Sequence, residues 1–371
     1  MVYFDYTATT PIDDEVLDTY IKTEKTFFAN TTSLHKLGQS SNYLYNKATE
    51  EIKDILKIGN HHIVYTANAT EANNLGIYGI VMKHRMGRII TTKIEHPSVY
   101  EVFKDLERRG YEVIYLDVDQ NGIIDLEQLA TSLNKETILV SIMWVNNIVG
   151  AIQPIEKVIP LVRAYPKACL HVDCVQGLCK IEPSFAFEQL DLFTLSAHKF
   201  YGPKGIGALI YRSNIELEKR LYGSDAQYGV KPGTISVGLI AALCKAIKKF
   251  YPETAKHYAY ACELNKFLRE KLQALGFYAL NSGNDASPYI ANISAGNING
   301  ETMVHLLEQN DIYISTGSAC SSKLKKPERT VLCVTNDQQR ALSSLRISLS
   351  HLTTKAEIEK LIEVLENAQN V

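Results

Sequence analysis

The segment LDLFTLSAHKFYGPKGIGALIY (residues 190–211) contains two apolar stretches on either side of a lysine-bearing turn. Residues 190–196 and 207–211 have the continuous apolar character of strands that are buried on both faces of a sheet. Lys199 follows the first stretch, and glycines and a proline then restrict the backbone behind it. The segment predicts an amine held rigidly at the edge of a sheet, although an isolated lysine beside a turn is more often simply solvated.

The order of the predicted elements indicates an α/β fold. Between residues 45 and 250, short apolar runs alternate with amphipathic helical stretches. This alternation favours a mostly parallel, seven-stranded sheet. The other candidate strands are residues 62–66, 88–92, 112–116, 138–144 and 169–172, and the helical stretches include residues 40–56, 99–109 and 155–164.

The pattern changes after the sequence PGT (residues 232–234). A helical section over residues 235–275 leads to a mixed region, and an amphipathic helix is predicted over residues 354–368. We therefore expect a large domain over residues 12–250. Residues 1–11 and 251–371 are expected to form a smaller α/β domain.

The composition limits the classes of ligand. The chain has 371 residues, of which 22% are charged, and its formal net charge of −2 gives no electrostatic basis for binding nucleic acid or an anionic membrane. The sequence shows no secretory signal and no apolar run near the roughly 20 residues of a membrane span. Its seven cysteines are scattered and form no C-x-x-C pair. We therefore expect a reduced, cytoplasmic protein without a metal site.

Polar residues follow several predicted strands, at the edge where the carboxyl ends of parallel strands meet. Ala69 and Thr70 open a helix whose N–H groups and dipole suit a phosphate, although a plain helix cap is the commoner explanation. His96 follows the next strand, where an isolated histidine is more often structural. Asn146 and Asn147 follow another strand, and adjacent asparagines are also typical of turns.

Two further strand ends complete the set. Asp173 stands at a buried strand end, where a carboxylate must be paired or hydrogen-bonded to stay charged. Gln176 lies three residues further on, and Ser196 and His198 flank Lys199.

One cofactor needs all of these groups together. Pyridoxal phosphate requires a lysine for its covalent attachment, an acid that keeps its pyridine nitrogen protonated, a donor to its ring hydroxyl and several donors for its phosphate. Lys199, Asp173 and Gln176 match the first three requirements in that order. Thr70, Ser196 and His198 match the phosphate donors. The sequence therefore predicts a pyridoxal-phosphate site.

Motifs along nearly the whole chain resemble those of the cysteine desulfurases of the NifS/IscS type, within the class V branch of the pyridoxal-phosphate aminotransferases. They are YFDYTATTP (residues 3–11), NTTSLHKLG (30–38), NATEANN (68–74), IEH (94–96), VNN (145–147), DCVQ (173–176), SAHKFYGPKGIG (196–207), TGSAC (316–320) and LRISLS (345–350). The resemblance implies the type I fold of pyridoxal-phosphate transferases and a homodimer.

The resemblance also implies residue roles. Lys199 would carry the cofactor, Asp173 would hold the pyridine nitrogen, and His96 would stack on the ring and act as a second acid or base. Asn147 would contact cofactor and substrate, and Arg346 would bind the substrate carboxylate, a task that suits a bidentate guanidinium.

Two segments in the C-terminal half carry further expectations about function. Cys320 lies in the small-residue segment STGSACSSK, which is predicted to form an exposed loop, and the resemblance implies that it accepts sulfur as a persulfide. Thr234 would reach the phosphate in the neighbouring subunit. The segment GSDAQYGVKPGT (residues 223–234) departs from the glycine-rich family pattern, and Lys231 replaces an arginine there.

We therefore expect a cysteine desulfurase that converts L-cysteine to L-alanine. Its sulfur would pass from Cys320 to an acceptor protein, either an Fe–S scaffold or a tRNA-thiolation enzyme. Two alternatives remain: another class V enzyme, such as an aminotransferase or selenocysteine lyase, or a divergent non-catalytic sulfur-relay scaffold.

Overall fold

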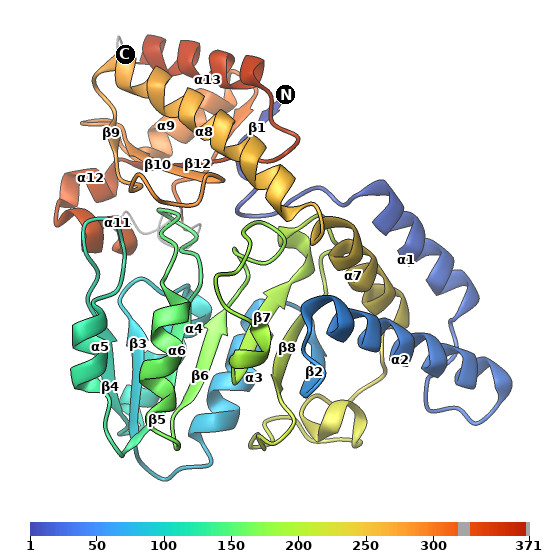
Figure 1. The fold of residues 1–371 in the computed structure, drawn as a ribbon. Helices are drawn as coiled ribbons and strands as arrows, with labels where there is room; N and C mark the ends of the chain where they lie inside the picture. The colour runs from blue at the N-terminus through green and yellow to red at the C-terminus, as the bar shows by residue number, and fades with distance from the viewer. Residues whose placement is uncertain (318–326, 369–371) are drawn as a thin grey trace.

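The structure, a computed structural model, describes residues 1–317 and 327–368. Its largest element is a seven-stranded sheet with the order β2-β8-β7-β6-β5-β3-β4 (Figure 1). All strand pairs are parallel except those of β8, which is antiparallel to both β7 and β2. The predicted α/β fold with a mostly parallel seven-stranded sheet is confirmed. The strands are β2 (His61–Thr66), β3 (Arg88–Thr92), β4 (Glu112–Leu116), β5 (Thr137–Met143), β6 (Cys169–Asp173), β7 (Leu192–Ser196) and β8 (Gly207–Arg212).

Each of these strands lies within two residues of its predicted bounds. The prediction succeeded because the central strands are continuous apolar runs; every residue of β5, for example, is buried. Along β2, Ile63 and Tyr65 pack into one hydrophobic cluster and Val64 packs into another. The sheet therefore has a core on each face, as its two-sided burial requires.

Helices cover both faces of this sheet. The cluster that contains Val64 includes residues of α3 (Ala69–Val81) and α4 (Pro97–Arg108). The opposite cluster includes residues of α2 (Lys36–Leu56), α6 (Ile155–Arg163) and α7 (Val237–Phe250). Two more helices pack beside them: α1 (Asp14–Thr26) contacts α7, and α5 (Leu126–Ser132) contacts β4 and α6.

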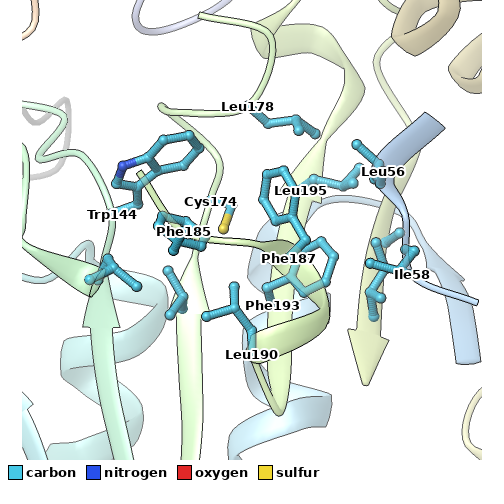
Figure 2. Close-up of a cluster of buried hydrophobic side chains, with 14 of the residues drawn as sticks. Leu56, Ile58, Trp144, Cys174, Leu178, Phe185, Phe187, Leu190, Phe193 and Leu195 are labelled. Carbon is cyan, nitrogen blue, oxygen red and sulfur yellow. The ribbon is translucent and has the colours of Figure 1, made fainter. Parts of the chain in front are cut away.

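An aromatic group fills the core beneath the turn that follows β6 (Figure 2). The rings of Trp144 and Phe185 meet edge to face with centroids 5.1 Å apart, and both are buried. Cys174 and Leu178, which belong to that turn, are fully buried in the same cluster. Dense packing here therefore holds the turn after β6 in place.

A second core forms beside the N- and C-termini (Figure 1). Its antiparallel sheet has the order β12-β10-β9, and a short parallel pair, β1 with β11, brings Val2 and Phe4 into the same core. The division at residues 12 and 250 stays a prediction. The elements here are β1 (Val2–Tyr3), β9 (Ala279–Leu280), β10 (Ile290–Ser294), β11 (Ile312–Tyr313), β12 (Ser344–Ser348), α8 (Thr254–Leu275), α9 (Gly300–Glu308), α11 (Arg329–Thr335), α12 (Gln338–Leu342) and α13 (Lys355–Asn367).

The helical section predicted over residues 235–275 is in fact two helices. α7 ends at Phe250 and α8 begins at Thr254, with Pro252 between them. Proline lacks the N–H group that a continuous helix needs and its ring clashes with the preceding turn, which accounts for the break.

Candidate functional site

A cavity of about 910 Å³ lies at the carboxyl ends of the parallel strands. The turns after β2, β3, β5, β6 and β7 contribute to its wall, together with the N-terminal segment and β12. The structure therefore brings most of the predicted site residues together. Those that line the cavity are Ala69, Thr70, His96, Asn147, Asp173, Gln176, Ser196, His198, Lys199 and Arg346.

Lys199 ends a short helical turn directly after β7. Its Nζ donates hydrogen bonds to the backbone carbonyls of Thr7 and Ala8, both at 2.8 Å. Burial, together with the positive charge of Arg346, lowers the pKa of Lys199 from 10.5 to about 8. Lys199 therefore presents an amine that loses its proton at mildly alkaline pH, as a nucleophilic lysine must.

Asp173 is buried at the end of β6, and it has no cationic partner among the described residues. Its Oδ2 accepts a hydrogen bond from Asn73 Nδ2 at 3.0 Å, and its Oδ1 accepts one from the Val175 N–H at 3.0 Å. The expectation that this buried carboxylate must be hydrogen-bonded is confirmed.

Gln176 lies in the turn after β6 and is also buried. Its Nε2 donates to the Thr7 carbonyl at 3.0 Å, and its Oε1 accepts a hydrogen bond from Lys180 Nζ at 2.8 Å. The amide orientation is therefore set by its neighbours, because the Thr7 carbonyl can only accept a hydrogen bond. Gln176 consequently turns donor hydrogens, rather than its oxygen, toward the Thr7 side of the cavity.

His96 caps the N-terminus of α4. The backbone N–H of Ser98 donates to His96 Nδ1 at 3.1 Å, and Ser98 Oγ lies 2.8 Å from the same nitrogen. Burial lowers the pKa of His96, the carboxylate of Asp173 opposes this effect, and the positive charge of Lys199 adds to it. The neutral imidazole is therefore favoured at this position.

The two asparagines after β5 differ in their contacts. Asn146 is fully buried; its Nδ2 donates to the Ile94 carbonyl, and its Oδ1 accepts from the N–H groups of Ile148 and Val149. Asn147 instead lines the cavity. Asn146 is thus the turn former, and Asn147 is available to a ligand.

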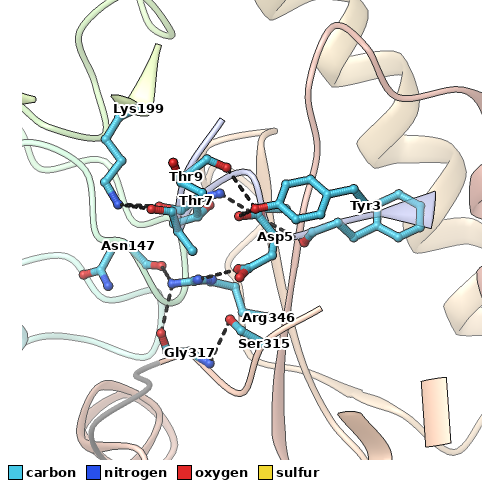
Figure 3. A network of polar contacts seen from close by, with 12 residues as sticks. Tyr3, Asp5, Thr7, Thr9, Asn147, Lys199, Ser315, Gly317 and Arg346 are labelled. Atoms are coloured by element: carbon cyan, nitrogen blue, oxygen red, sulfur yellow. Dashed lines mark hydrogen bonds and ion pairs between the residues drawn. The ribbon is translucent and has the colours of Figure 1, made fainter. Parts of the chain in front are cut away.

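Arg346 projects from β12 toward the N-terminal segment and the turn after β5 (Figure 3). Its Nη1 donates to the carbonyls of Asn147 and Gly317, both at 3.0 Å, and its Nη2 pairs with Asp5 Oδ1 at 2.8 Å. Its Nε is buried without a hydrogen-bond partner among the described residues. The guanidinium is firmly oriented and keeps donor capacity on its Nε/Nη2 edge.

One corner of the cavity collects donors for an anion. The start of α3 at Ala69 and Thr70 exposes N–H groups that cannot bond within the helix. Ser196 Oγ is buried there without a hydrogen-bond partner among residues 1–317 and 327–368. His198 Nδ1 lies 3.1 Å from Thr9 Oγ1, and burial lowers the pKa of His198 to about 4. The buried, unpartnered hydroxyl indicates that this corner is built for a ligand.

Among the described residues, Thr234 is the predicted site residue that does not join this cavity. Thr234 is exposed and is not part of the cavity wall. Cys320 lies outside the described residues, as does the rest of segment 318–326.

The structure adds residues that the sequence reasoning missed. Asp5, Thr7 and Asn73 contact predicted site residues, and Lys180 and Ser98 do so as well. Asp5 and Thr7 belong to the segment YFDYTATTP, and Asn73 belongs to NATEANN. The motifs indicated these segments, but only the contacts in the structure identify the individual residues.

The described part of the chain contains no group of three or more histidine, cysteine, aspartate or glutamate side chains placed to hold a metal ion. Among the same residues, no helix is long and apolar enough to cross a membrane.

The fold and this site define a class of protein, and comparison with known proteins names it: the chain belongs to the Aminotransferase class-V family, whose profile matches residues 2–361. It is 35% identical to the "NifS/IcsS protein homolog" of Lactobacillus delbrueckii subsp. bulgaricus, over 99% of this chain and 96% of that protein. It is also 35% identical to the "Cysteine desulfurase IscS" of Vibrio cholerae serotype O1, over 99% and 92% of the respective chains. A solved structure named "NIFS-LIKE PROTEIN" superposes with a TM-score of 0.92 at 31% identity, over 100% of this chain and 99% of that one. The chain is therefore a class V enzyme similar over its full length to cysteine desulfurases, and its family implies pyridoxal phosphate.

Proposed function

We propose that this chain is a pyridoxal-phosphate-dependent cysteine desulfurase that converts L-cysteine to L-alanine. The observation that carries the proposal is the shared cavity, where the amine of Lys199, the guanidinium of Arg346 and the carboxylate of Asp173 are all available to one ligand. The name of the Vibrio cholerae relative supports cysteine as the substrate.

The residues present fit pyridoxal phosphate. Asp173 would hold the pyridine nitrogen and Gln176 would donate to the ring hydroxyl, while Ala69, Thr70 and His198 would surround the phosphate. The unpartnered hydroxyl of Ser196 supports this assignment, because a phosphate oxygen would complete its hydrogen bonding. When bound to Lys199, the cofactor supplies an electron sink for bonds at the substrate's α-carbon.

The protein's own groups then bind and move the substrate. Arg346 would bind the carboxylate of cysteine through its Nε/Nη2 edge, and Asn147 would contact cofactor and substrate from the adjacent turn. Lys199 Nζ would accept and return the α-proton, since its pKa of about 8 lies close to neutral pH. His96 would stack on the cofactor ring from the start of α4.

Cys320 would accept the sulfur. The Cβ–S bond of L-cysteine breaks, a bond forms between that sulfur and Cys320 Sγ, and the protons of the two thiols remain on the alanine and the persulfide. Gly317 is the last described residue before segment 318–326. It lines the cavity, and its carbonyl accepts a hydrogen bond from Arg346. Gly317 precedes Cys320 by three residues in the sequence, and its place in the cavity wall supports this assignment.

A homodimer and a protein acceptor complete the proposal. Phe28, Leu34 and Tyr222 are 70%, 92% and 84% exposed, and apolar side chains of this kind are typical of surfaces that a second subunit covers. Exposed Thr234 would reach the partner's cofactor phosphate. The acceptor would be an Fe–S scaffold or a tRNA-thiolation enzyme, and a cytoplasmic location stays a prediction.

The test is production of alanine and sulfide from L-cysteine with a reductant, comparing wild type with Cys320→Ala and Lys199→Ala. We expect wild type to form both products, Lys199→Ala to lose covalent cofactor absorbance and turnover, and Cys320→Ala to retain the cofactor without releasing sulfide.

Two other results would replace the proposal. Full activity of Cys320→Ala would point to a lyase or an aminotransferase that makes no persulfide. Cofactor binding by wild type without either product, even with candidate acceptors present, would point to a sulfur-relay scaffold.

A further inference from the structure

A continuous hydrogen-bonded path joins Asp173 to His96 beneath the cavity. Asn73 Nδ2 donates to Asp173 Oδ2 at 3.0 Å and to Ser98 Oγ at 2.8 Å, and Ser98 Oγ lies 2.8 Å from His96 Nδ1. Thr194 Oγ1 donates to Asn73 Oδ1 at 2.7 Å. Asn73 and Thr194 are fully buried, so the Asn73 amide and the Thr194 hydroxyl are shielded from water.

The orientation of the Asn73 amide follows from its neighbours. If the amide were reversed, its oxygen would face a carboxylate oxygen of Asp173, and two acceptors would repel each other. The nitrogen must therefore face Asp173, and its second hydrogen is directed to Ser98. The Thr194 hydroxyl then supplies the remaining hydrogen bond, to the amide oxygen. All of Asn73's polar atoms are satisfied in this single arrangement.

The same logic sets the protonation of His96. Ser98 Oγ already accepts a hydrogen from Asn73, so its own hydrogen is free for His96 Nδ1. The Ser98 backbone N–H also donates to Nδ1, at 3.1 Å. Both contacts need a lone pair on Nδ1, so the ring proton resides on Nε2.

We propose that Asn73 is a positioning residue that couples Asp173 to His96 through Ser98 and holds His96 as a neutral imidazole with its proton on Nε2. His96, which lines the cavity, then has a hydrogen-bond donor at Nε2, because the lone pair of its Nδ1 is already engaged by Ser98. The charged groups around the ring agree with a neutral form: burial lowers the pKa of His96, Asp173 opposes this, and Lys199, Arg329 and Arg346 add to it.

The tautomer of His96 does not depend on the proposed function, but its use in catalysis rests on that function. The assignment refines the expected role of His96. A histidine whose Nδ1 is capped cannot accept a proton in the resting state without breaking its contacts with Ser98. Proton transfer at the substrate's α-carbon is therefore left to Lys199, while His96 contributes a fixed donor and a stacking surface.

The test measures the tautomer of His96 directly, by long-range ¹H–¹⁵N NMR of the full-length protein labelled with ¹⁵N-histidine. His96→Gln identifies the resonance, and spectra are recorded with pyridoxal phosphate bound and after its removal. We expect the Nε2–H pattern in both states. An Nδ1–H or imidazolium pattern near neutral pH overturns the proposal, even in an enzyme that makes alanine from cysteine.

Two buried, nearly isosteric variants then locate the cause. Asn73→Leu removes the links to Asp173 and Ser98, whereas Thr194→Val removes only the hydroxyl that satisfies the amide oxygen. We expect Asn73→Leu to give a mixture of tautomers and to raise the dissociation constant of pyridoxal phosphate about tenfold or more, as expected when a charged group loses a hydrogen bond. Thr194→Val should keep the Nε2–H pattern.

Equal changes in the two variants would show a general packing defect and would overturn the role of Asn73. If Asn73→Leu proves too unstable to measure, Ser98→Ala provides the second test, because it removes the hydroxyl contact with Nδ1 and retains the backbone one. An unchanged His96 spectrum and cofactor affinity in Ser98→Ala would also overturn the proposal.

Discussion

The turns after β6 and β7 each carry a lysine, Lys180 buried and Lys199 half-buried, yet only one of these lysines reaches the cavity. In the β7 turn (residues 196–207), Lys199 Nζ meets two backbone carbonyls at the cavity wall. In the β6 turn (residues 173–181), Lys180 Nζ donates to Gln176 Oε1 and is not part of the wall.

The electrostatic state of the two amines is similar. Burial lowers the pKa of Lys199 to about 8 and that of Lys180 to about 7, with nearby positive charge adding to the effect in each case. A lowered pKa is therefore shared by both lysines and does not identify the nucleophile. Access to the cavity does, and Lys180 is left to orient the side chain of Gln176.

The largest expected effect is on the rate of alanine formation, and it distinguishes Lys199 from Lys180. Lys199→Met should reduce alanine formation at least about 10³-fold, because the general acid–base step and the covalent attachment are lost together. The absorbance of bound pyridoxal phosphate and the rate of alanine release measure this. Turnover within tenfold of wild type would mean that another group, with Lys180 the first candidate, replaces Lys199.

The next effect compares how the two turns are held. A Cβ on Gly177 would lie 2.1 Å from Trp144 Cε3, inside the buried aromatic group, so Gly177→Ala should lower the free energy of unfolding by about 3 kcal/mol. In the β7 turn, a Cβ on Gly205 would lie 3.9 Å from Leu239 Cδ1, an ordinary contact, but φ is +85°, so Gly205→Ala should cost only about 1–2 kcal/mol. Urea titration of both variants measures the difference. The reverse order would show that backbone conformation matters more than packing beneath the β6 turn.

These two turns also show how much of the fold and site could be predicted. The strands β6 and β7 are apolar runs, and Asp173 and Lys199 stand at their ends, so their place at one sheet edge followed from the order of elements. Asn73 contacts Asp173 from 100 residues earlier in the chain, and Asp5 meets Arg346 across 341 residues. Such partners depend on how α3 and the N-terminal segment pack against the sheet edge. The hydrophobic periodicity of the sequence does not predict that packing.

A third prediction concerns the pH dependence of cofactor attachment. Since the pKa of Lys199 is lowered from 10.5 to about 8, the reactive neutral amine grows about tenfold between pH 7 and pH 9 and then levels off. The rate at which the cofactor-free protein attaches pyridoxal phosphate, followed by absorbance, should rise with the same midpoint. A rate that continues to climb toward pH 10.5 would mean that Lys199 is solvated like an ordinary lysine.

The smallest effect concerns Lys180 and completes the comparison. Lys180→Met keeps the length and apolar stem of the side chain but removes the hydrogen bond to Gln176, which is worth about 1 kcal/mol. The dissociation constant of pyridoxal phosphate should therefore rise about fivefold while the cofactor still attaches to Lys199. Gln176→Leu removes the same hydrogen bond from the other side, together with Gln176's own contact with the cofactor, so adding Lys180→Met to Gln176→Leu should give little further loss if Lys180 acts through Gln176. Fully additive losses would instead assign Lys180 a direct electrostatic effect on the cavity.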